Sequence, residues 1–198
     1  MCGIIAAASN RNVGKLLVQG LHKMEYRGYD SAGIALHQTD QIAHLRTLGK
    51  VKLLEEKMIA EKPKSKLGIA HTRWATHGEP SEENAHPHMS NERVYIVHNG
   101  IIENYLDLKD FLKKEGYSFS SQTDSELIAH LLEYFLNKGN NMLDSMYLTK
   151  EKLDGAYAIA AIDRENDQNI VIARSKSPLL IGIGTDEFLS ASDPLAIG

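Results

Sequence analysis

The first third of the chain alternates between short apolar runs and segments with helical spacing. A short unbroken apolar run between turn signals predicts a buried strand, and apolar residues at every third or fourth position predict a helix. We therefore predict strands at residues 3–9, 32–37, 42–48 and 66–73, and helices at 13–24 and 51–62. A short polar segment separates the second and third strands, which predicts a hairpin.

The middle of the chain begins with a long polar stretch, residues 74–92, that shows no periodicity. A loop of this length in a compact domain is usually functional or disordered. A strand follows at 93–98 and is predicted to end in a turn at Asn99-Gly100. We predict helices at 104–114, 125–137 and 143–153, and closing strands at 156–163, 170–174, 179–184 and 188–190.

The order of these segments predicts an α+β fold. Strands open the chain, helices fill its middle, and closely spaced strands, which favour antiparallel pairing, close it. Two antiparallel sheets packed together, with helices on the outside, would bury every apolar face. There is no repeat and no low-complexity linker, so we predict one domain over residues 1–198. A new apolar segment begins at the last residues, and we therefore expect the domain to be truncated at its C-terminus.

Composition narrows the classes of partner and compartment. The 198 residues are 42% hydrophobic and carry a net charge of −4, which argues against nucleic acid bound on a basic face. No apolar run approaches the roughly 18 residues that span a bilayer, and the N-terminus lacks the features of a secretory signal. The single cysteine allows no internal disulfide. We therefore expect a cytoplasmic protein with no membrane partner.

The most informative residue is that cysteine, Cys2, which stands between Met1 and Gly3. Removal of Met1 would place a thiol and a free α-amine on one residue. An α-amine has a pKa of roughly 7.7–8.0, so it can serve as a base that activates the nucleophile. Cys2 is therefore a candidate catalytic nucleophile, although a lone cysteine near a terminus is more often a small apolar residue.

A second candidate group is the segment His71-Thr72-Arg73-Trp74, where a predicted buried strand ends. A buried guanidinium needs an anion, and its planar fork matches a carboxylate. The alternatives are structural: an arginine that extends to solvent, a histidine packed within the strand, and a tryptophan that anchors a surface loop.

Two later motifs offer further groups. Asn99 and Gly100 supply a side-chain amide and an approachable backbone N–H, which are the donors of an oxyanion hole, although the pair is also a common turn signal. Asp124 would hold a substrate ammonium, or it complements the dipole of the helix that follows. Thr123 and Glu126 have the spacing of a capping box for that helix.

The polar stretch also contains three histidines, His77, His86 and His88. Such a cluster is one sign of a zinc site, but no second cysteine and no H-E-x-x-H sequence accompany it. We therefore predict no metal and favour structural or loop-ordering roles for these side chains.

Seven segments together resemble the glutaminase domain of class II glutamine amidotransferases, which are N-terminal-nucleophile hydrolases. They are MCGI, EYRGYDSAGIA, LGKV, GIAHTRWATHGEPSEENAHPH, VHNGIIENY, TDSELIAH and LDGAYAIA. They occur in the expected order over nearly the whole chain. The RGYDSAG turn and the Arg loop most resemble the members of this family that aminate a sugar phosphate.

The resemblance implies a four-layer αββα sandwich and a mechanism that needs no cofactor. Met1 is removed, and Cys2 attacks the side-chain amide of glutamine with its own α-amine as base. Asn99 and the N–H of Gly100 hold the oxyanion, and the products are glutamate and ammonia.

The resemblance also implies how glutamine is bound. Arg73 would clamp its α-carboxylate and Asp124 its α-ammonium. The remaining implied site residues contact the substrate or support those that do: Trp74, Thr76 and His77 at the pocket, with Trp74 as its gate, and Arg27, His71 and His86 behind it.

In the parent enzyme, the resemblance implies, a C-terminal sugar-phosphate isomerase region uses the ammonia to convert fructose 6-phosphate to glucosamine 6-phosphate, and the enzyme is a homodimer. That region is absent from the sequence, so we expect the isolated chain to act only as a glutaminase. Three alternatives stay open: an amidohydrolase for a different amide, a catalytically silent binding or regulatory domain, and a zinc-binding module.

Overall fold

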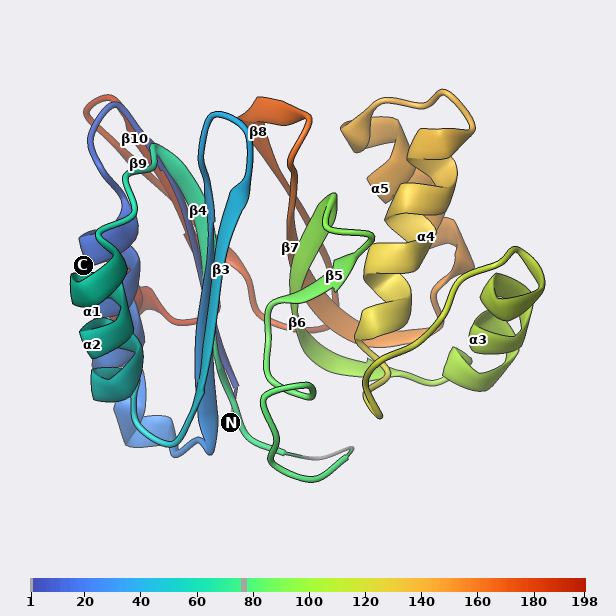
Figure 1. Ribbon diagram of the computed structural model, residues 1–198, viewed down its shortest axis with the longest axis horizontal. Helices are drawn as coiled ribbons and strands as arrows, with labels where there is room; N and C mark the ends of the chain where they lie inside the picture. Colours follow the sequence, from blue (N-terminus) through green and yellow to red (C-terminus); the bar gives the residue numbers. More distant parts are fainter. Residues whose placement is uncertain (1, 76–77) are drawn as a thin grey trace.

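Two antiparallel sheets lie face to face in the computed structural model, which describes residues 2–75 and 78–198 (Figure 1). The larger sheet contains β1 (Gly3–Ser9), β2 (Ser31–His37), β3 (Ile42–Leu48), β4 (Leu67–Arg73), β9 (Leu180–Gly184) and β10 (Glu187–Ala191), in the order β3-β2-β4-β1-β10-β9. The smaller sheet contains β5 (His88–Ser90), β6 (Val94–Ile102), β7 (Gly155–Asp163) and β8 (Asn166–Ser175), in the order β5-β6-β7-β8.

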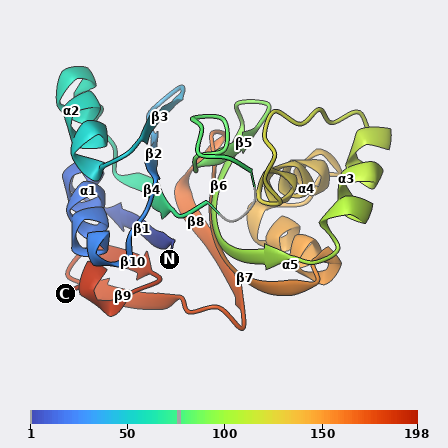
Figure 2. The same ribbon diagram turned by 90° about the horizontal axis from the view of Figure 1, so that it is seen from below.

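Helices cover the outer face of each sheet. The larger sheet is covered by α1 (Gly14–Lys23) and α2 (Val51–Glu61), and the smaller by α3 (Tyr105–Lys114), α4 (Glu126–Asn137) and α5 (Met142–Lys152) (Figures 1 and 2). The four layers confirm the predicted αββα sandwich. None of the described helices is both long and apolar enough to cross a membrane.

Strand β1 shows how the layers are held together. Successive side chains of a strand point to opposite faces, and here Ile5 and Ala7 pack under the helices, whereas Ile4 and Ala6 pack against the smaller sheet. All four are at most 1% exposed. Burying an isoleucine side chain stabilises a fold by about 1.5–3 kcal/mol, so this strand contributes to two cores at once.

The same strand fixes the position of the chain's N-terminal end. β1 lies in the centre of the larger sheet, paired with β4 on one side and with β10 on the other. Its first residue, Gly3, is opposite Thr72, so Cys2 is placed beside Arg73 and Trp74 at the end of β4. The N–H of Ile4 also donates to Ser192 Oγ at 2.9 Å, just beyond β10.

The predicted turn at Asn99-Gly100 is wrong. Strand β6 continues through both residues, which are opposite Ala158 and Tyr157 of β7. Gly100 has a φ of +129°, which a glycine adopts without strain, so the ladder with β7 passes through a dipeptide that favours turns elsewhere. The predicted long loop is also interrupted, because His88–Ser90 forms β5 against β6.

The predicted capping box is wrong in its partners. Helix α4 begins at Glu126, and its N-cap residue is Ser125, which makes no side-chain capping bond. The Glu126 carboxylate instead accepts hydrogen bonds from the N–H groups of Ser120 and Ser121, at 2.8 and 2.7 Å. It therefore orders the segment that leads into Asp124 rather than the helix end itself.

Candidate active site

Cys2 lies between the two sheets and is bonded to both. Its Sγ accepts the backbone N–H of Trp74 at 3.2 Å. Its carbonyl oxygen accepts Asn99 Nδ2 at 3.2 Å, from the smaller sheet, and Arg27 Nη1 at 3.4 Å, from the short 3-10 turn after α1. The guanidinium of Arg27 is itself paired with Asp193 at 2.6 Å. The thiol and the carbonyl group of Cys2 are therefore both held in place.

Burial raises the pKa of the Cys2 thiol, and the hydrogen bond from Trp74 and the charge of Arg73 offset only part of that rise. A thiol is nucleophilic as its thiolate. Near neutral pH this thiol is protonated, so a base is needed to activate it.

Arg73 ends strand β4 and is only 4% exposed. Its Nη2 and Nη1 donate to the backbone carbonyl oxygens of Gly78 and Glu79, at 3.3 and 3.4 Å. Neutral carbonyls are weaker partners for a guanidinium than a carboxylate, which forms charge-assisted bonds with the fork. The geometry thus leaves Arg73 able to exchange these bonds for a stronger anionic partner.

Asp124 is a second buried charge, 6% exposed. Its Oδ2 accepts the N–H of Ile102, the last residue of β6, at 2.8 Å. Among residues 2–75 and 78–198 no cation lies within ion-pair distance of this carboxylate. Its Oδ1 accepts the hydroxyl of Ser125 at 3.5 Å. A buried carboxylate is most favourable when a positive charge is paired with it, so a cationic ligand group would be a favourable partner.

Gly100 leaves no space for a side chain. A Cβ built there would lie 1.9 Å from the carbonyl oxygen of Ala156 on the neighbouring strand. This contact, together with the positive φ, explains in physical terms why a glycine occupies the position. Gly100 is also one of the residues that line the cavity beside Cys2.

One small cavity, of about 30 Å³, brings most of the predicted site together. Six predicted residues line it: Cys2, Arg73, Trp74, His86, Gly100 and Asp124. Three further lining residues, His98, Thr123 and Ser125, were not predicted as site residues. Each directly neighbours a predicted site residue in the chain, which is the signal that could have identified them.

The other predicted residues lie behind the cavity or outside the described part of the chain. Asn99 does not line the cavity but contacts Cys2, and His71 contacts Asn99 at 2.9 Å. Arg27 does not line the cavity but contacts the carbonyl oxygen of Cys2. Met1, Thr76 and His77 lie outside the described residues, so the predictions that concern them stay predictions.

Trp74 lies at the rim, with 52% of its surface exposed. Its ring lies against Gly28, where an added Cβ would be 2.8 Å from Trp74 Cζ3. The adjacent Ala75 N–H is bonded to the carboxylate of Asp30. The loop after β4 is thus attached at its first residues to the turn between α1 and β2.

Four histidines are buried around the site: His71, His86, His88 and His98. Burial lowers the pKa of each, and that of His71 falls to about 3. They are therefore neutral and serve as hydrogen-bonding and packing groups. Within the described residues no three His, Cys, Asp or Glu side chains are arranged to hold a metal ion.

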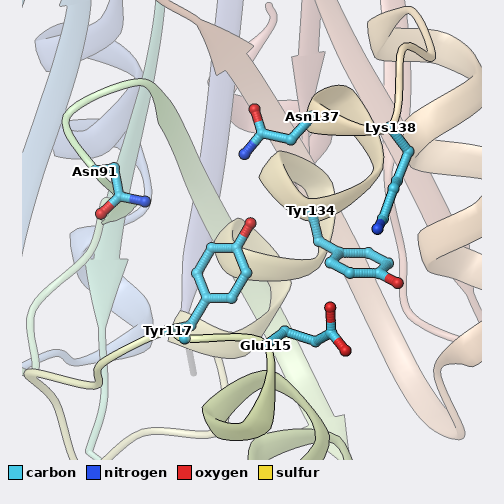
Figure 3. Close-up of a pocket in the computed structure, with 7 residues that line it drawn as sticks. Asn91, Glu115, Tyr117, Tyr134, Asn137 and Lys138 are labelled. Carbon is cyan, nitrogen blue, oxygen red and sulfur yellow. The ribbon is translucent and has the colours of Figure 1, made fainter.

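A larger pocket, of about 350 Å³, lies beside α4 and is lined by residues that include Asn91, Glu115, Tyr117, Tyr134 and Lys138 (Figure 3). It contains no thiol, and its lining combines two phenol rings with amide and charged groups. The thiol of Cys2 and the buried charges of Arg73 and Asp124 are all found at the smaller cavity, which we therefore take as the candidate active site.

A thiol at the end of a central strand, in a sandwich of two antiparallel sheets, defines the class of N-terminal-nucleophile amidotransferases. Residues 71–198 match the family pattern of the glutamine amidotransferase domain, and the chain belongs to this family. The resemblance found in the sequence is thereby confirmed.

Relatives place the chain more closely. It is 52% identical over 198 residues to the glutamine–fructose-6-phosphate aminotransferase [isomerizing] of Haemophilus ducreyi, and 50% identical to that of Vibrio parahaemolyticus. Both alignments cover 100% of this chain but 32% of the relative, so the chain spans about a third of their length.

The fold is similar to that of a solved glutamine phosphoribosylpyrophosphate amidotransferase from B. subtilis. The TM-score is 0.84 at 26% identity, and the match covers 98% of this chain and 42% of that one. The similarity extends over both sheets and their helices, which confirms the fold type predicted for N-terminal-nucleophile hydrolases.

Proposed function

We propose that the domain hydrolyses the side-chain amide of glutamine through a thioester on Cys2. The observation that carries the proposal is the common cavity of one thiol, one buried guanidinium and one buried carboxylate. Glutamine is a zwitterion with an amide tail, and these three groups complement its carboxylate, its ammonium and its reacting carbon.

Arg73 binds the α-carboxylate, which replaces the backbone carbonyls now on its fork, and Asp124 binds the α-ammonium. Trp74, Thr76 and His77 complete the pocket. A cavity of about 30 Å³ has space for one or two water molecules, so glutamine enters only when the pocket wall, with Trp74 at its rim, moves outward.

The chemistry begins once Met1 has been removed. The freed α-amine takes the proton of the thiol, and Sγ forms a bond to the amide carbon. The oxyanion that results is held by Asn99 Nδ2 and the N–H of Gly100. The intermediate collapses with transfer of a proton to the leaving nitrogen, ammonia departs, and water hydrolyses the γ-glutamyl thioester to glutamate.

The names of the relatives support a larger context. We propose that residues 1–198 are the glutaminase part of a longer cytoplasmic enzyme, which aminates fructose 6-phosphate to glucosamine 6-phosphate. In that enzyme a C-terminal isomerase region receives the ammonia, and the whole assembles as a homodimer. Residues 1–198 supply the glutaminase reaction of that enzyme.

The test is intact mass spectrometry of the purified chain with and without 6-diazo-5-oxo-norleucine, a glutamine-like alkylating agent, together with ammonia release from glutamine. We expect the mass to lack one methionine and to gain one adduct on Cys2. The matched variant Cys2→Ser should give no adduct. A Cys2→Ser protein that releases ammonia as fast as the parent would refute the proposal.

A further inference from the structure

The side-chain amide of Asn99 is held at both ends. Its Nδ2 lies 3.2 Å from the carbonyl oxygen of Cys2, and its Oδ1 lies 2.9 Å from Nε2 of His71. One end of such an amide is a donor and the other an acceptor. A half-turn of the amide about its last bond would therefore exchange the two and place oxygen against the nucleophile's backbone.

The hydrogen bonds of His71 determine which end of the Asn99 amide faces Cys2. Its Nε2 also lies 3.1 Å from the backbone carbonyl oxygen of His98. A carbonyl oxygen only accepts hydrogen bonds, so Nε2 must carry the hydrogen. The Asn99 atom that faces this N–H must then be the oxygen, and the NH₂ group must face Cys2.

The ring of His71 is itself held in one state. It is fully buried, and burial lowers its pKa to about 3, so it stays neutral. Its ring centroid is 4.1 Å from that of His86, and its backbone is paired with β1 and β2 on both sides. Its Nδ1 has no hydrogen-bond partner among the described residues, which is consistent with a bare nitrogen at that position.

We propose that His71 is a positioning residue that fixes the amide of Asn99 with its donor toward Cys2 and the reacting carbonyl. The inference rests on the proposed function, because it assigns a role to the amide in that reaction. An amide has two N–H donors; the carbonyl of Cys2 takes one, and the other serves the substrate oxygen. If the amide turned over, its oxygen would repel the oxyanion instead of stabilising it.

Three substitutions of His71 distinguish the effect of its hydrogen-bond donor from the effect of the size of its ring. In glutamine, Nε2 is as many bonds from Cα as Nε2 of histidine, so His71→Gln keeps a donor that reaches Asn99 and His98. In asparagine, Nδ2 corresponds to Nδ1 of histidine, so His71→Asn places the same group too far away. His71→Phe keeps the ring and removes the donor.

The measurement is steady-state glutamine hydrolysis by the full chain. We expect His71→Gln to keep kcat within about fivefold, and His71→Asn and His71→Phe to lose about 10- to 100-fold, less than the loss of an oxyanion donor itself. KM should change by less than about twofold, because the amide acts on charge that develops in the transition state. A matched loss of kcat in the Gln and Asn variants would overturn the inference.

A double-mutant cycle distinguishes positioning from general damage. If His71 acts through Asn99, then His71→Phe should reduce kcat no further, within about twofold, when Asn99 is already alanine. Losses that multiply would overturn the inference. A control at a buried histidine on the neighbouring strand, His37→Phe, should leave kcat unchanged; its Nε2 is bonded to Arg164 O at 2.8 Å. Thermal unfolding of each variant reports any general destabilisation.

The cycle also tells the two proposals apart. An Asn99→Ala protein with normal turnover would refute the assigned role of the amide and thus part of the proposed function. If Asn99→Ala lowers kcat but His71→Gln and His71→Asn have the same kcat, the positioning role alone would be refuted.

Discussion

The two ends of the central strands differ in both space and chemistry. Strand β4 ends at Arg73 beside the cavity of about 30 Å³ and begins at Leu67 beside a hollow of about 510 Å³. The lining of the far hollow includes His37, Lys64 and Lys66. It is the larger of the two spaces by far, yet it contains neither a thiol nor a buried ion.

The polar groups at the far end serve the fold. Ser65 Oγ is bonded to the carbonyl oxygens of His37 and Leu67, and Asn12 Oδ1 accepts the N–H groups of Gly14 and Ser65. At the near end, by contrast, Arg73 and Asp124 are both buried, and in the described part of the chain Asp124 forms no ion pair. Burying a charged side chain costs free energy unless a partner is supplied. A buried carboxylate that has no ion-pair partner therefore indicates a ligand site better than the volume of a cavity does.

The largest expected effect at the near end is that of Asn99→Ala. Removing one oxyanion donor typically lowers kcat by about 10²–10³, and glutamine should still bind, because the amide does not contact its charged groups. The measurement is kcat and KM for ammonia release. The far-end control is Asn12→Ala, which should lower stability and leave kcat unchanged. Near-normal turnover by Asn99→Ala would contradict the view that the near end of the strands is catalytic and the far end structural.

Gly100→Ala should unfold or distort the near end. The new methyl group would lie 1.9 Å from Ala156 O at a φ of +129°, and we expect a loss of about 3 kcal/mol or more in the free energy of unfolding. Gly116→Ala is the matched control, since its φ is also positive, at +93°, but nothing lies within 4 Å. It should cost about 1 kcal/mol. Urea unfolding of both variants measures the difference, and equal losses would contradict the steric explanation.

Asp124→Asn should weaken glutamine binding without stopping the reaction. The amide oxygen can still accept the N–H of Ile102, but the charge is lost. A hydrogen bond to a charged group contributes about 1.5–3 kcal/mol, so KM should rise about 10- to 100-fold with little change in kcat. The same substitution at the far end, Asp167→Asn, should leave KM unchanged. An unchanged KM in Asp124→Asn would assign the ammonium to another partner.

The smallest effect is expected for Lys66→Ala at the far hollow. The seven residues of β4, at about 3.3 Å per residue, place it about 20 Å from the cavity. Exposed charges are screened over about 10 Å at moderate ionic strength. The ratio kcat/KM should therefore stay within about twofold. A tenfold change in glutamine hydrolysis would show that the far hollow takes part in catalysis.

Most of the fold could be predicted because the local pattern of apolar and polar residues determines where its helices and strands lie. The strand predicted at 42–48 is observed at Ile42–Leu48, and the helix predicted at 51–62 ends one residue earlier, at Glu61. What could not be predicted depends on distant partners. The passage of β6 through Asn99-Gly100 requires β7, which lies more than fifty residues later in the chain.

The candidate site was predictable to a different degree. The types of Cys2, Arg73 and Asp124 indicated a zwitterionic ligand, but their common location came from the resemblance to a family. Local patterns contain no information on how β1, β4 and the segment before α4 meet. For the same reason the contact from His71 to Asn99 could not be foreseen, since it joins two different sheets.

The central position of β1 has a consequence for how the protein is made. β1 is synthesised long before its partner β10, which is among the last described segments of the chain. At about 5–20 residues per second, the amino end waits roughly 10–40 s before the sheet can close around it. The removal of Met1 that the proposed function requires can therefore take place in this interval, before β10 pairs with β1.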